Sequence, residues 1–255
     1  MRLSTIVDRL DDRLDTDAYA GVDPSTNGLQ VGPGEADVET VAFAVDGVVE
    51  TFERAAELGA DLLVVHHGVV WAGLDRVTGL EYDRVRALID NDVALYASHL
   101  PLDGHPALGN AAGIASRLEM EGVGPFGHEG GVSIGQRGTL PEPLTHDGLR
   151  DELVGALPVD AEDVQVLDHG PDRIEDVAVV TGAGADFFRE AIDAGVDAFV
   201  TGEGKQKLYH EAQEAGVGVF LVGHYATETV GVRTLQSLVD EWGPETTFIQ
   251  APTGL

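Results

Sequence analysis

Three pairs of side chains in this sequence have the types and spacings expected of metal ligands. Imidazole nitrogens and carboxylate oxygens bind Fe, Mn, Co, Ni and Zn, and paired ions of this kind activate water for hydrolysis. The chain has nine histidines and no cysteine, so thiolate ligands, cysteine nucleophiles and disulfides are excluded. The three pairs are His66 with His67, His99 with Asp103, and His224 with Glu228.

The adjacent histidines His66 and His67 follow an apolar run and precede Gly68. Neighbouring side chains on a regular strand point to opposite faces, so one ion cannot easily take both imidazoles. At a strand end that turns at a glycine, the two rings can spread toward two neighbouring ions. The adjacency therefore favours a dinuclear site over a mononuclear one. One buried structural histidine beside one exposed histidine explains the pair equally well.

Asp103 lies in the stretch His99-Leu-Pro-Leu-Asp-Gly-His-Pro106. Pro101 and Pro106 predict a stiff loop rather than an ordinary helix, because proline lacks the backbone N–H that a helix interior needs. A carboxylate held on such a loop is a good metal ligand, although Asp-Gly is also a common turn. His99 is then either a ligand itself or a residue that orients one.

His224 and Glu228 follow a second apolar strand, at the turn into a predicted helix. An i, i+4 spacing places both on one helix face. A glutamate near a helix N-terminus also complements the helix dipole without binding a metal. Glu203 and His210 border the same predicted strand ends, and with His99 they are our candidates for moving protons.

Alternating apolar strands and amphipathic helices must position these residues. The predicted strands are 41–45, 62–65 and 93–96, and the predicted helices are 4–14, 52–58 and 85–89. Ser4 is the expected N-cap of the first helix. This alternation indicates an α/β fold with a parallel sheet, in which ligands bind beyond the carboxyl ends of the strands.

An internal repeat divides the chain. Residues 41–68 and 177–204 align without a gap at an offset of 136, and eight of the 28 aligned positions are identical. The repeat predicts two similar α/β lobes related by a pseudo-twofold, with their polar strand ends facing one cleft. We place the N-terminal lobe at 1–126 and the C-terminal lobe at 127–255, intertwined as one functional unit.

The charge balance excludes several partners. The 255 residues include 45 acids and 15 bases, for a formal net charge of −30. Without a Lys/Arg cluster, binding to nucleic acid or to an anionic membrane is not expected. No apolar signal core or membrane-spanning run is present, so we expect a cytoplasmic protein. The acid excess predicts a halophilic protein adapted to a salt-filled cytoplasm, because salt screens the self-repulsion.

Several motifs occur in the order found in one known family. They are Asn27-Gly-Leu-Gln-Val-Gly32, His66-His-Gly68 with Trp71, Ser98-His-Leu-Pro-Leu-Asp103, Gly202-Glu203 and Gly223-His-Tyr-Ala-Thr-Glu228. Together they resemble the NIF-three-like proteins, also named GTP cyclohydrolase 1 type 2 homologues, from residue 3 to about residue 242. The resemblance implies two similar α/β lobes, a dinuclear metal centre in the cleft between them, and a toroidal homohexamer.

The resemblance also implies a ligand set. The motif matches give the metal ligands as His66, His67, Asp103, His224 and Glu228. His99 matches a position near the metals that is not usually counted as a ligand. Tyr225 departs from the family pattern, which has a second histidine there, and Gly202 to Lys207 is less acidic than in many relatives. These departures leave the ligands intact and affect substrate preference and proton transfer.

The expected cofactors are two divalent ions, drawn from Fe, Mn, Zn, Co and Ni. Our first hypothesis for the function is a metal-dependent hydrolase of an unidentified small molecule, with GTP cyclohydrolase-like activity suggested by the family name. The second is a protein that stores, delivers or senses a metal. The third is an interaction ring in which the metals only fix the lobes together.

Overall fold

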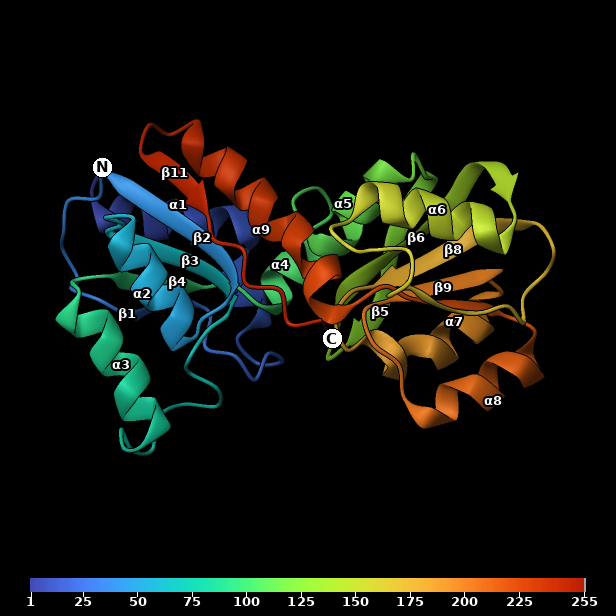
Figure 1. The fold of residues 1–255 in the computed structure, drawn as a ribbon, viewed down its shortest axis with the longest axis horizontal. Coiled ribbons are helices and arrows are strands. Elements are labelled where there is room, and N and C mark those ends of the chain that lie inside the picture. Colours follow the sequence, from blue (N-terminus) through green and yellow to red (C-terminus); the bar gives the residue numbers. More distant parts are fainter. Residues whose placement is uncertain (255) are drawn as a thin grey trace. The chain divides into compact units, whose positions relative to one another are not determined.

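The computed structural model describes residues 1–254, which form two compact units (Figure 1). The first unit contains Met1–Leu102 and Val232–Ala251, and the second contains Asp103–Gly231 and the residues from Pro252 on. Each unit has one mixed β-sheet flanked by helices, so the α/β fold class is confirmed. The lobe boundary predicted at Gly127 falls within strand β5 (Glu121–Glu129), and the division there stays a prediction.

The first unit has a five-stranded sheet with the order β1-β4-β3-β2-β11. The strands are β1 (Gly28–Val31), β2 (Thr40–Asp46), β3 (Leu62–His67), β4 (Ala94–Ala97) and β11 (Glu245–Phe248). The three predicted strands are present as β2, β3 and β4, and they are parallel. Strand β11 is parallel to β2, whereas β1 pairs with β4 in the antiparallel direction.

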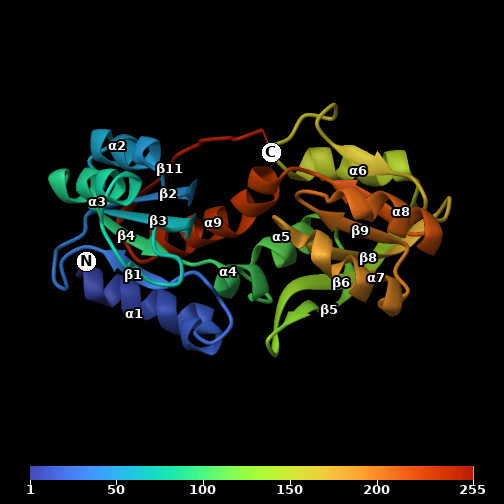
Figure 2. The ribbon, with the colours of Figure 1, turned by 90° about the horizontal axis from the view of Figure 1, so that it is seen from below.

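Helices cover both faces of this sheet (Figure 2). The helix α1 (Leu3–Leu14) lies on one face, and α2 (Val49–Glu57) and α3 (Leu80–Asp90) lie on the other. Phe52 of α2 and Leu88 of α3 pack with alternate residues of the strands, such as Leu63. The expected N-cap at Ser4 is wrong, since α1 begins at Leu3 and Arg2 makes no side-chain cap.

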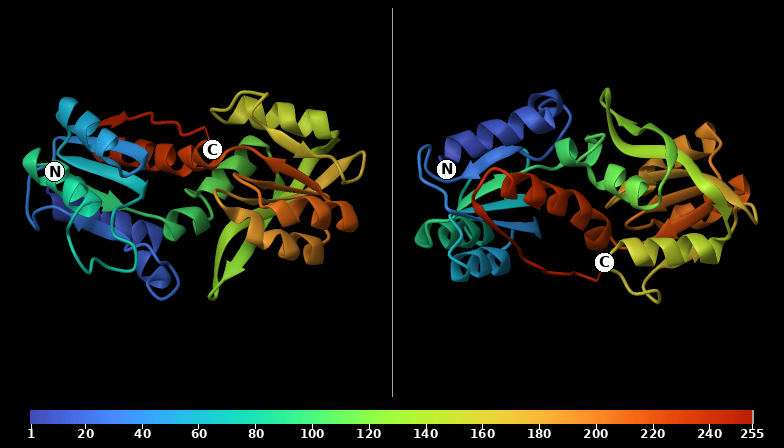
Figure 3. Two further views of the ribbon diagram at one scale, coloured as in Figure 1. Left: turned by 60° about the horizontal axis from the view of Figure 1, so that its bottom comes forward. Right: turned by 90° about the horizontal axis from the view of Figure 1, so that it is seen from above.

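The second unit has a six-stranded sheet with the order β5-β6-β8-β9-β10-β7. The additional strands are β6 (Val132–Leu144), β7 (Gln165–Leu167), β8 (Ile174–Val180), β9 (Ala198–Thr201) and β10 (Gly218–Leu221). Figure 3 shows helix α6 on one face of this sheet and helices α7 and α8 on the other. Their bounds are His146–Ala156 for α6, Phe188–Ala194 for α7 and Gln206–Ala215 for α8. Helix α5 (Asn110–Arg117) packs on the α6 side.

The repeat found in the sequence is a repeat of structure. In the first unit Val41 pairs with Leu62, and in the second Val177 pairs with Ala198, which are the same positions shifted by 136. The following strands, β4 and β10, are each parallel to the middle strand and each carry an antiparallel edge strand. Each unit therefore brings the carboxyl ends of three equivalent parallel strands to one edge of its sheet, and the first unit adds a fourth parallel strand, β11.

The stretch between Pro101 and Pro106 contains a helix that was not expected. Helix α4 (Leu100–Gly104) includes Pro101, so the prediction of a loop was wrong there. Proline is tolerated in the first turn of a helix, where its missing N–H would have no partner in the helix. The chain passes from the first unit to the second within α4, and returns within helix α9 (His224–Asp240).

Candidate metal centre

In the first unit, three histidine rings converge beyond the strand ends. His66 and His67 are the last two residues of β3, and His99 follows β4. Their ring centroids are 4.6 Å apart for His66 and His67, 5.1 Å for His66 and His99, and 5.6 Å for His67 and His99. One ring nitrogen from each lies within 4.8 Å of the others, so this group could hold a metal ion.

Each of these histidines donates a hydrogen bond from Nδ1 to an oxygen. The acceptors are the Ser98 carbonyl for His66 at 2.8 Å, Asp46 Oδ1 for His67 at 2.9 Å, and Asp23 Oδ1 for His99 at 2.8 Å. A carbonyl or carboxylate can only accept, so Nδ1 carries the proton and the lone pair of the neutral ring is on Nε2. Metal-binding histidines characteristically have an oxygen acceptor of this kind, which fixes the tautomer and the ring orientation.

The surroundings of Asp23 keep its carboxylate ionised to accept the hydrogen bond from His99. Its side chain is fully buried, and burial alone would raise the pKa of the carboxyl group. Hydrogen bonds from His99, from the Asn27 side chain and from the Ser25 backbone N–H outweigh burial and lower the pKa of Asp23. Asp23 therefore stays ionised and holds the His99 ring in place. His99 also makes a T-shaped contact with Trp71, with ring centroids 5.1 Å apart.

In the second unit, Asp103 is buried and held by two side chains. Its Oδ1 accepts hydrogen bonds from Asn110 Nδ2 at 2.9 Å and from Thr181 Oγ1 at 3.1 Å. The Asn110 amide is itself fixed, because its Oδ1 accepts from the backbone N–H of Gly231 at 2.8 Å. A buried carboxylate needs such partners or a cation, since burying an isolated charge is costly. Asp103 thus has the burial and the support of a metal ligand.

His224 and Glu228 lie one turn apart at the start of α9, as the i, i+4 spacing predicts. His224 Nε2 is 3.1 Å from Glu228 Oε1, and His224 Nδ1 is 2.8 Å from Glu203 Oε1. The hydrogen bond to Glu228, opposed by burial and helped by Glu203, raises the pKa of His224 from 6.5 to about 9. Without a metal the imidazole is therefore protonated at neutral pH, and a metal ion would replace that proton.

Gly182 makes the space that Glu228 occupies. It has a φ of +57°, and a Cβ built on it would overlap with Glu228 Oε1 and lie 3.0 Å from His224 Nε2. The backbone N–H of Gly182 is fixed by Thr227 Oγ1 at 3.1 Å. Only glycine combines this backbone conformation with such a close approach of a carboxylate.

The proton-transfer candidates have different surroundings. Glu203 contacts His224, whereas His210 is exposed on α8 with its ring against Tyr209, at a centroid distance of 5.4 Å. In residues 1–254, His210 belongs to none of the groups that could hold a metal. Lys205 forms an ion pair with Asp186, as does Lys207 at 3.2 Å. The role of His210 in proton transfer stays a prediction.

The residues that support the candidate ligands were missed by the sequence analysis. They are Asp23, Asp46, Asn110, Thr181 and Gly182. Asp46 carried one signal, since it directly follows the predicted strand 41–45, the strand before the one that ends at His66 and His67. Asp23 carried no such signal, because it lies 76 residues before its partner His99, in a loop.

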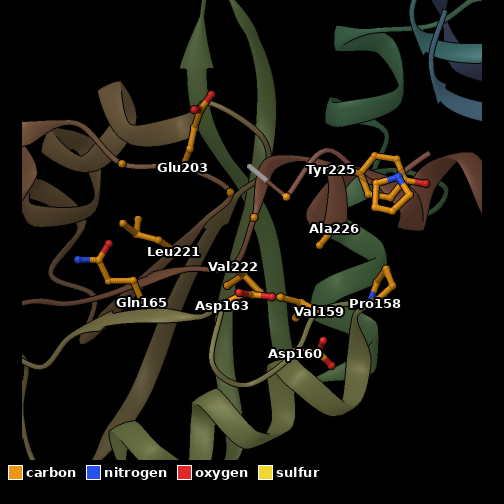
Figure 4. A pocket seen from close by; sticks show the side chains of 15 residues that line it. Pro158, Val159, Asp160, Asp163, Gln165, Glu203, Leu221, Val222, Tyr225 and Ala226 are labelled. Atoms are coloured by element: carbon orange, nitrogen blue, oxygen red, sulfur yellow. The ribbon is translucent and has the colours of Figure 1, made fainter. Parts of the chain in front are cut away.

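A pocket of about 500 Å³ opens beside Glu203 in the second unit (Figure 4). One wall follows the carboxyl ends of β9 and β10 and includes Gly202, Gly223 and Tyr225. The opposite wall comes from residues 158–165, which follow α6. Glu203 therefore both contacts His224 and lines a space large enough for a small molecule.

Comparison with known proteins gives consistent matches over the whole chain. A family model described as Duf34/NIF3 (NGG1p interacting factor 3) matches residues 1–253. A protein of Halobacterium salinarum named GTP cyclohydrolase 1 type 2 homolog is 60% identical over 255 residues, covering 100% of both chains. The protein of the same name from Archaeoglobus fulgidus is 41% identical over 256 residues, again covering 100% of both.

Solved structures agree with these matches. A structure titled protein ybgI, of unknown function, has a TM-score of 0.90 and 32% identity, with 100% of both chains covered. The structure of TTHA1606 from Thermus thermophilus has a TM-score of 0.87 and 34% identity, also over 100% of both chains.

Proposed function

Because the chain belongs to the Duf34/NIF3 family, we propose that it binds two divalent metal ions and uses them to hydrolyse a small molecule. The proposed ligands are His66, His67, Asp103, His224 and Glu228. The observation that carries the proposal is the common orientation of His66, His67 and His99. Each turns Nδ1 to an oxygen acceptor, which fixes the ring orientation and the tautomer that are characteristic of metal-binding histidines.

The donor set fits a pair of first-row divalent ions. It contains three imidazoles and two carboxylates, a combination that suits Fe, Mn, Co, Ni or Zn. Bound ions would supply Lewis-acid activation of water and of an electrophile. Asp103 and Glu228 would neutralise about half of the positive charge of two divalent ions, and both are buried, so their attraction to cations is weakly screened.

Glu203 is the residue that we propose to move protons. Its Oε1 accepts from His224, and its side chain is 48% exposed and lines the pocket, so it has access to both the histidine and a substrate. A carboxylate in this position can take a proton from water and return it to a leaving group. The pocket next to Glu203 supports a hydrolase over a protein that only stores, delivers or senses metal.

We further propose that the chain forms a homohexamer. We also propose that it works in a salt-filled cytoplasm. The support for self-association is a set of exposed apolar side chains on one segment of the first unit: Trp71, Leu74, Val77, Leu80 and Tyr82, each 40–56% exposed. The segment 71–90 has four acids and three bases, against 45 and 15 in the chain. A nearly neutral apolar surface is where two copies of charge −30 repel each other least.

Metal analysis followed by a substrate screen tests the proposed function. The protein is purified at molar KCl, its metal content is measured by mass spectrometry, and each candidate metal is then restored to a stripped sample. Turnover that follows the occupancy of two ions per chain supports a hydrolase. Two exchangeable ions without turnover would favour storage, delivery or sensing. One ion or none per chain at saturation would contradict the dinuclear centre.

A further inference from the structure

The pocket beside Glu203 has the position and size of a ligand site. It holds about 500 Å³, within the range of small-molecule pockets, and it lies beyond the carboxyl ends of the parallel strands β9 and β10. Its lining comes entirely from the second unit. The shape of the pocket therefore does not depend on any residue of the first unit.

Three carboxylates give this pocket a single sign of charge. Asp160, Asp163 and Glu203 line it, and no Lys, Arg or His is among its described lining residues. Figure 4 shows Glu203 at one end of the labelled side chains and Asp160 at the other. The nearest basic residue in sequence, Lys205, is paired with Asp186. Carboxylates only accept hydrogen bonds, so the pocket favours a ligand with several N–H donors and opposes a phosphate.

The remaining walls are largely apolar. Tyr225 is buried and offers an aromatic ring, and the other apolar residues of the lining are Pro158, Val159, Leu221, Val222, Ala226 and Pro252. The aromatic ring and the aliphatic side chains can pack against the two faces of a planar ligand ring. The carboxylates can accept hydrogen bonds from N–H groups on the edge of that ring.

We infer that this pocket binds an amino-substituted nitrogen heterocycle that carries no phosphate. The inference rests on the proposed function, because it names the substrate class of the same hydrolase. It also separates this chain from the activity in its relatives' printed name. The triphosphate of GTP has no basic side chain to meet in this pocket, whereas the N–H groups of an amino-substituted base have carboxylates to accept from them.

Binding of three related probes to the metal-free protein tests the inference. Guanosine has the N–H edge, inosine lacks the exocyclic amine, and guanosine 5′-monophosphate adds one phosphate. Equilibrium dialysis at fixed KCl, with a chelator present, gives the three dissociation constants. We expect guanosine to bind at least about tenfold more tightly than inosine or the monophosphate, which is the scale of one lost hydrogen bond or one like-charge contact.

The double variant Asp160→Asn with Asp163→Asn identifies the pocket. This variant should bind guanosine about tenfold more weakly. The ratio of the dissociation constants of guanosine and its monophosphate should also become smaller. Asp172→Asn is the matched control, because it removes a charge from an exposed position of the same unit that is not in the lining. Thermal melting shows that each variant is folded.

The inference is overturned if the monophosphate binds as tightly as guanosine, if the double variant binds guanosine like the control, or if none of the probes binds at millimolar concentration. The assay uses metal-free protein. Its result can therefore be interpreted even if the protein proves not to bind two metal ions. If separate metal analysis finds two ions per chain while the metal-free protein binds none of the probes, only the substrate class is overturned.

Discussion

Asp61 and Asp197 occupy equivalent positions in the two units and accept the same pair of hydrogen bonds. Asp61 Oδ2 accepts from two consecutive backbone N–H groups at the start of β2, at 2.8 and 3.0 Å. Asp197 Oδ2 does so near the start of β8, also at 2.8 and 3.0 Å. Each aspartate also makes backbone bonds to both neighbouring strands. It therefore fixes the register of three parallel strands.

We expect Asp61→Ala and Asp197→Ala to destabilise the fold by similar amounts. Each removes two hydrogen bonds to a charged acceptor, so the free energy of unfolding should fall by about 1–3 kcal/mol. Urea unfolding at molar KCl measures the change. Asp193→Ala is the control, since its exposed pair with Arg189 at 3.7 Å contributes little. A loss in only one of the two variants would contradict the structural equivalence.

The repeat is the part of the fold that could be predicted most fully from the sequence. Its gapless offset predicted β2, β3, β8 and β9, because the spacing of strand, helix and turn is set by local periodicity and by Gly59 and Gly195. The edge strands were not predicted in this way. The strands β1 and β11 are short and partly exposed, so they carry little apolar signal of their own.

The candidate ligands could be found from the sequence, but their supporting residues could not. Histidines beside glycine at strand ends stand out by type and spacing. Their acceptors depend on long-range packing, since Asp46 lies 21 residues before His67. The helix at Pro101 shows a different limit. Proline disfavours a helix interior but not its first turn, and the sequence does not mark where α4 begins.

Gly182→Ala should damage the second half of the site while leaving the first intact. The added methyl group would overlap with Glu228 Oε1, so the carboxylate must move, and a φ of +57° is strained for alanine. We expect metal occupancy to fall from two ions per chain toward one, and stability to fall by about 1–3 kcal/mol. Mass spectrometry and urea unfolding measure the two effects.

Gly155→Ala is the matched control for Gly182→Ala. Gly155 lies in α6, and a Cβ there would have no neighbour within 4 Å. Alanine is the better helix former, so this variant should keep its metal and gain up to about 1 kcal/mol. Full occupancy in Gly182→Ala would show that Glu228 does not need its present position to bind metal.

Metal binding to the second unit should depend on pH through His224. The pKa of this histidine is raised from 6.5 to about 9, so the protonated ring stabilises the metal-free protein below pH 6.5. That stabilisation is lost as the pH rises toward 9, where the ring becomes neutral. A metal must displace the proton at lower pH, so its apparent affinity should rise about tenfold per pH unit from pH 6.5 to 9.

Glu228→Gln tests the source of this pH dependence. The hydrogen bond to Glu228 is the largest cause of the raised pKa, so an amide should return the pKa of His224 toward 6.5. The fold should persist, metal occupancy should fall, and the NMR titration of His224 should move to lower pH. An unchanged titration would assign the shift to Glu203 instead.

Assembly and stability should both depend on salt. The charge of −30 is screened at molar KCl, where the Debye length is about 3 Å, and the protein should elute there as a hexamer. At low salt it should dissociate or unfold. Leu80→Asp combined with Val77→Asp should dissociate it at molar KCl, since both side chains are exposed and apolar. A monomer at every salt concentration would rule out the proposed assembly.

The rings of His67 and His99 have centroids 5.6 Å apart. Replacing each of these two histidines should nevertheless affect metal binding to a different extent. His67→Ala removes a proposed ligand and should weaken metal binding by more than about 100-fold. His99→Ala removes a residue that orients the site and should cost about 10–100-fold, with metal retained at saturation and turnover lost. Titration of metal into the stripped variants gives the order.

His99→Asn separates the two roles that this residue could have. The asparagine amide can still donate an N–H to Asp23, as His99 Nδ1 does at 2.8 Å, but it has no counterpart of Nε2. If His99 positions the neighbouring ligands through its hydrogen bond to Asp23, the asparagine variant should bind metal more tightly than His99→Ala. Equal loss in the two variants, at the level of His67→Ala, would make His99 a ligand through Nε2. It would then stand in the first unit where His224 stands in the second, and the internal repeat would predict the ligand set better than the family motif does.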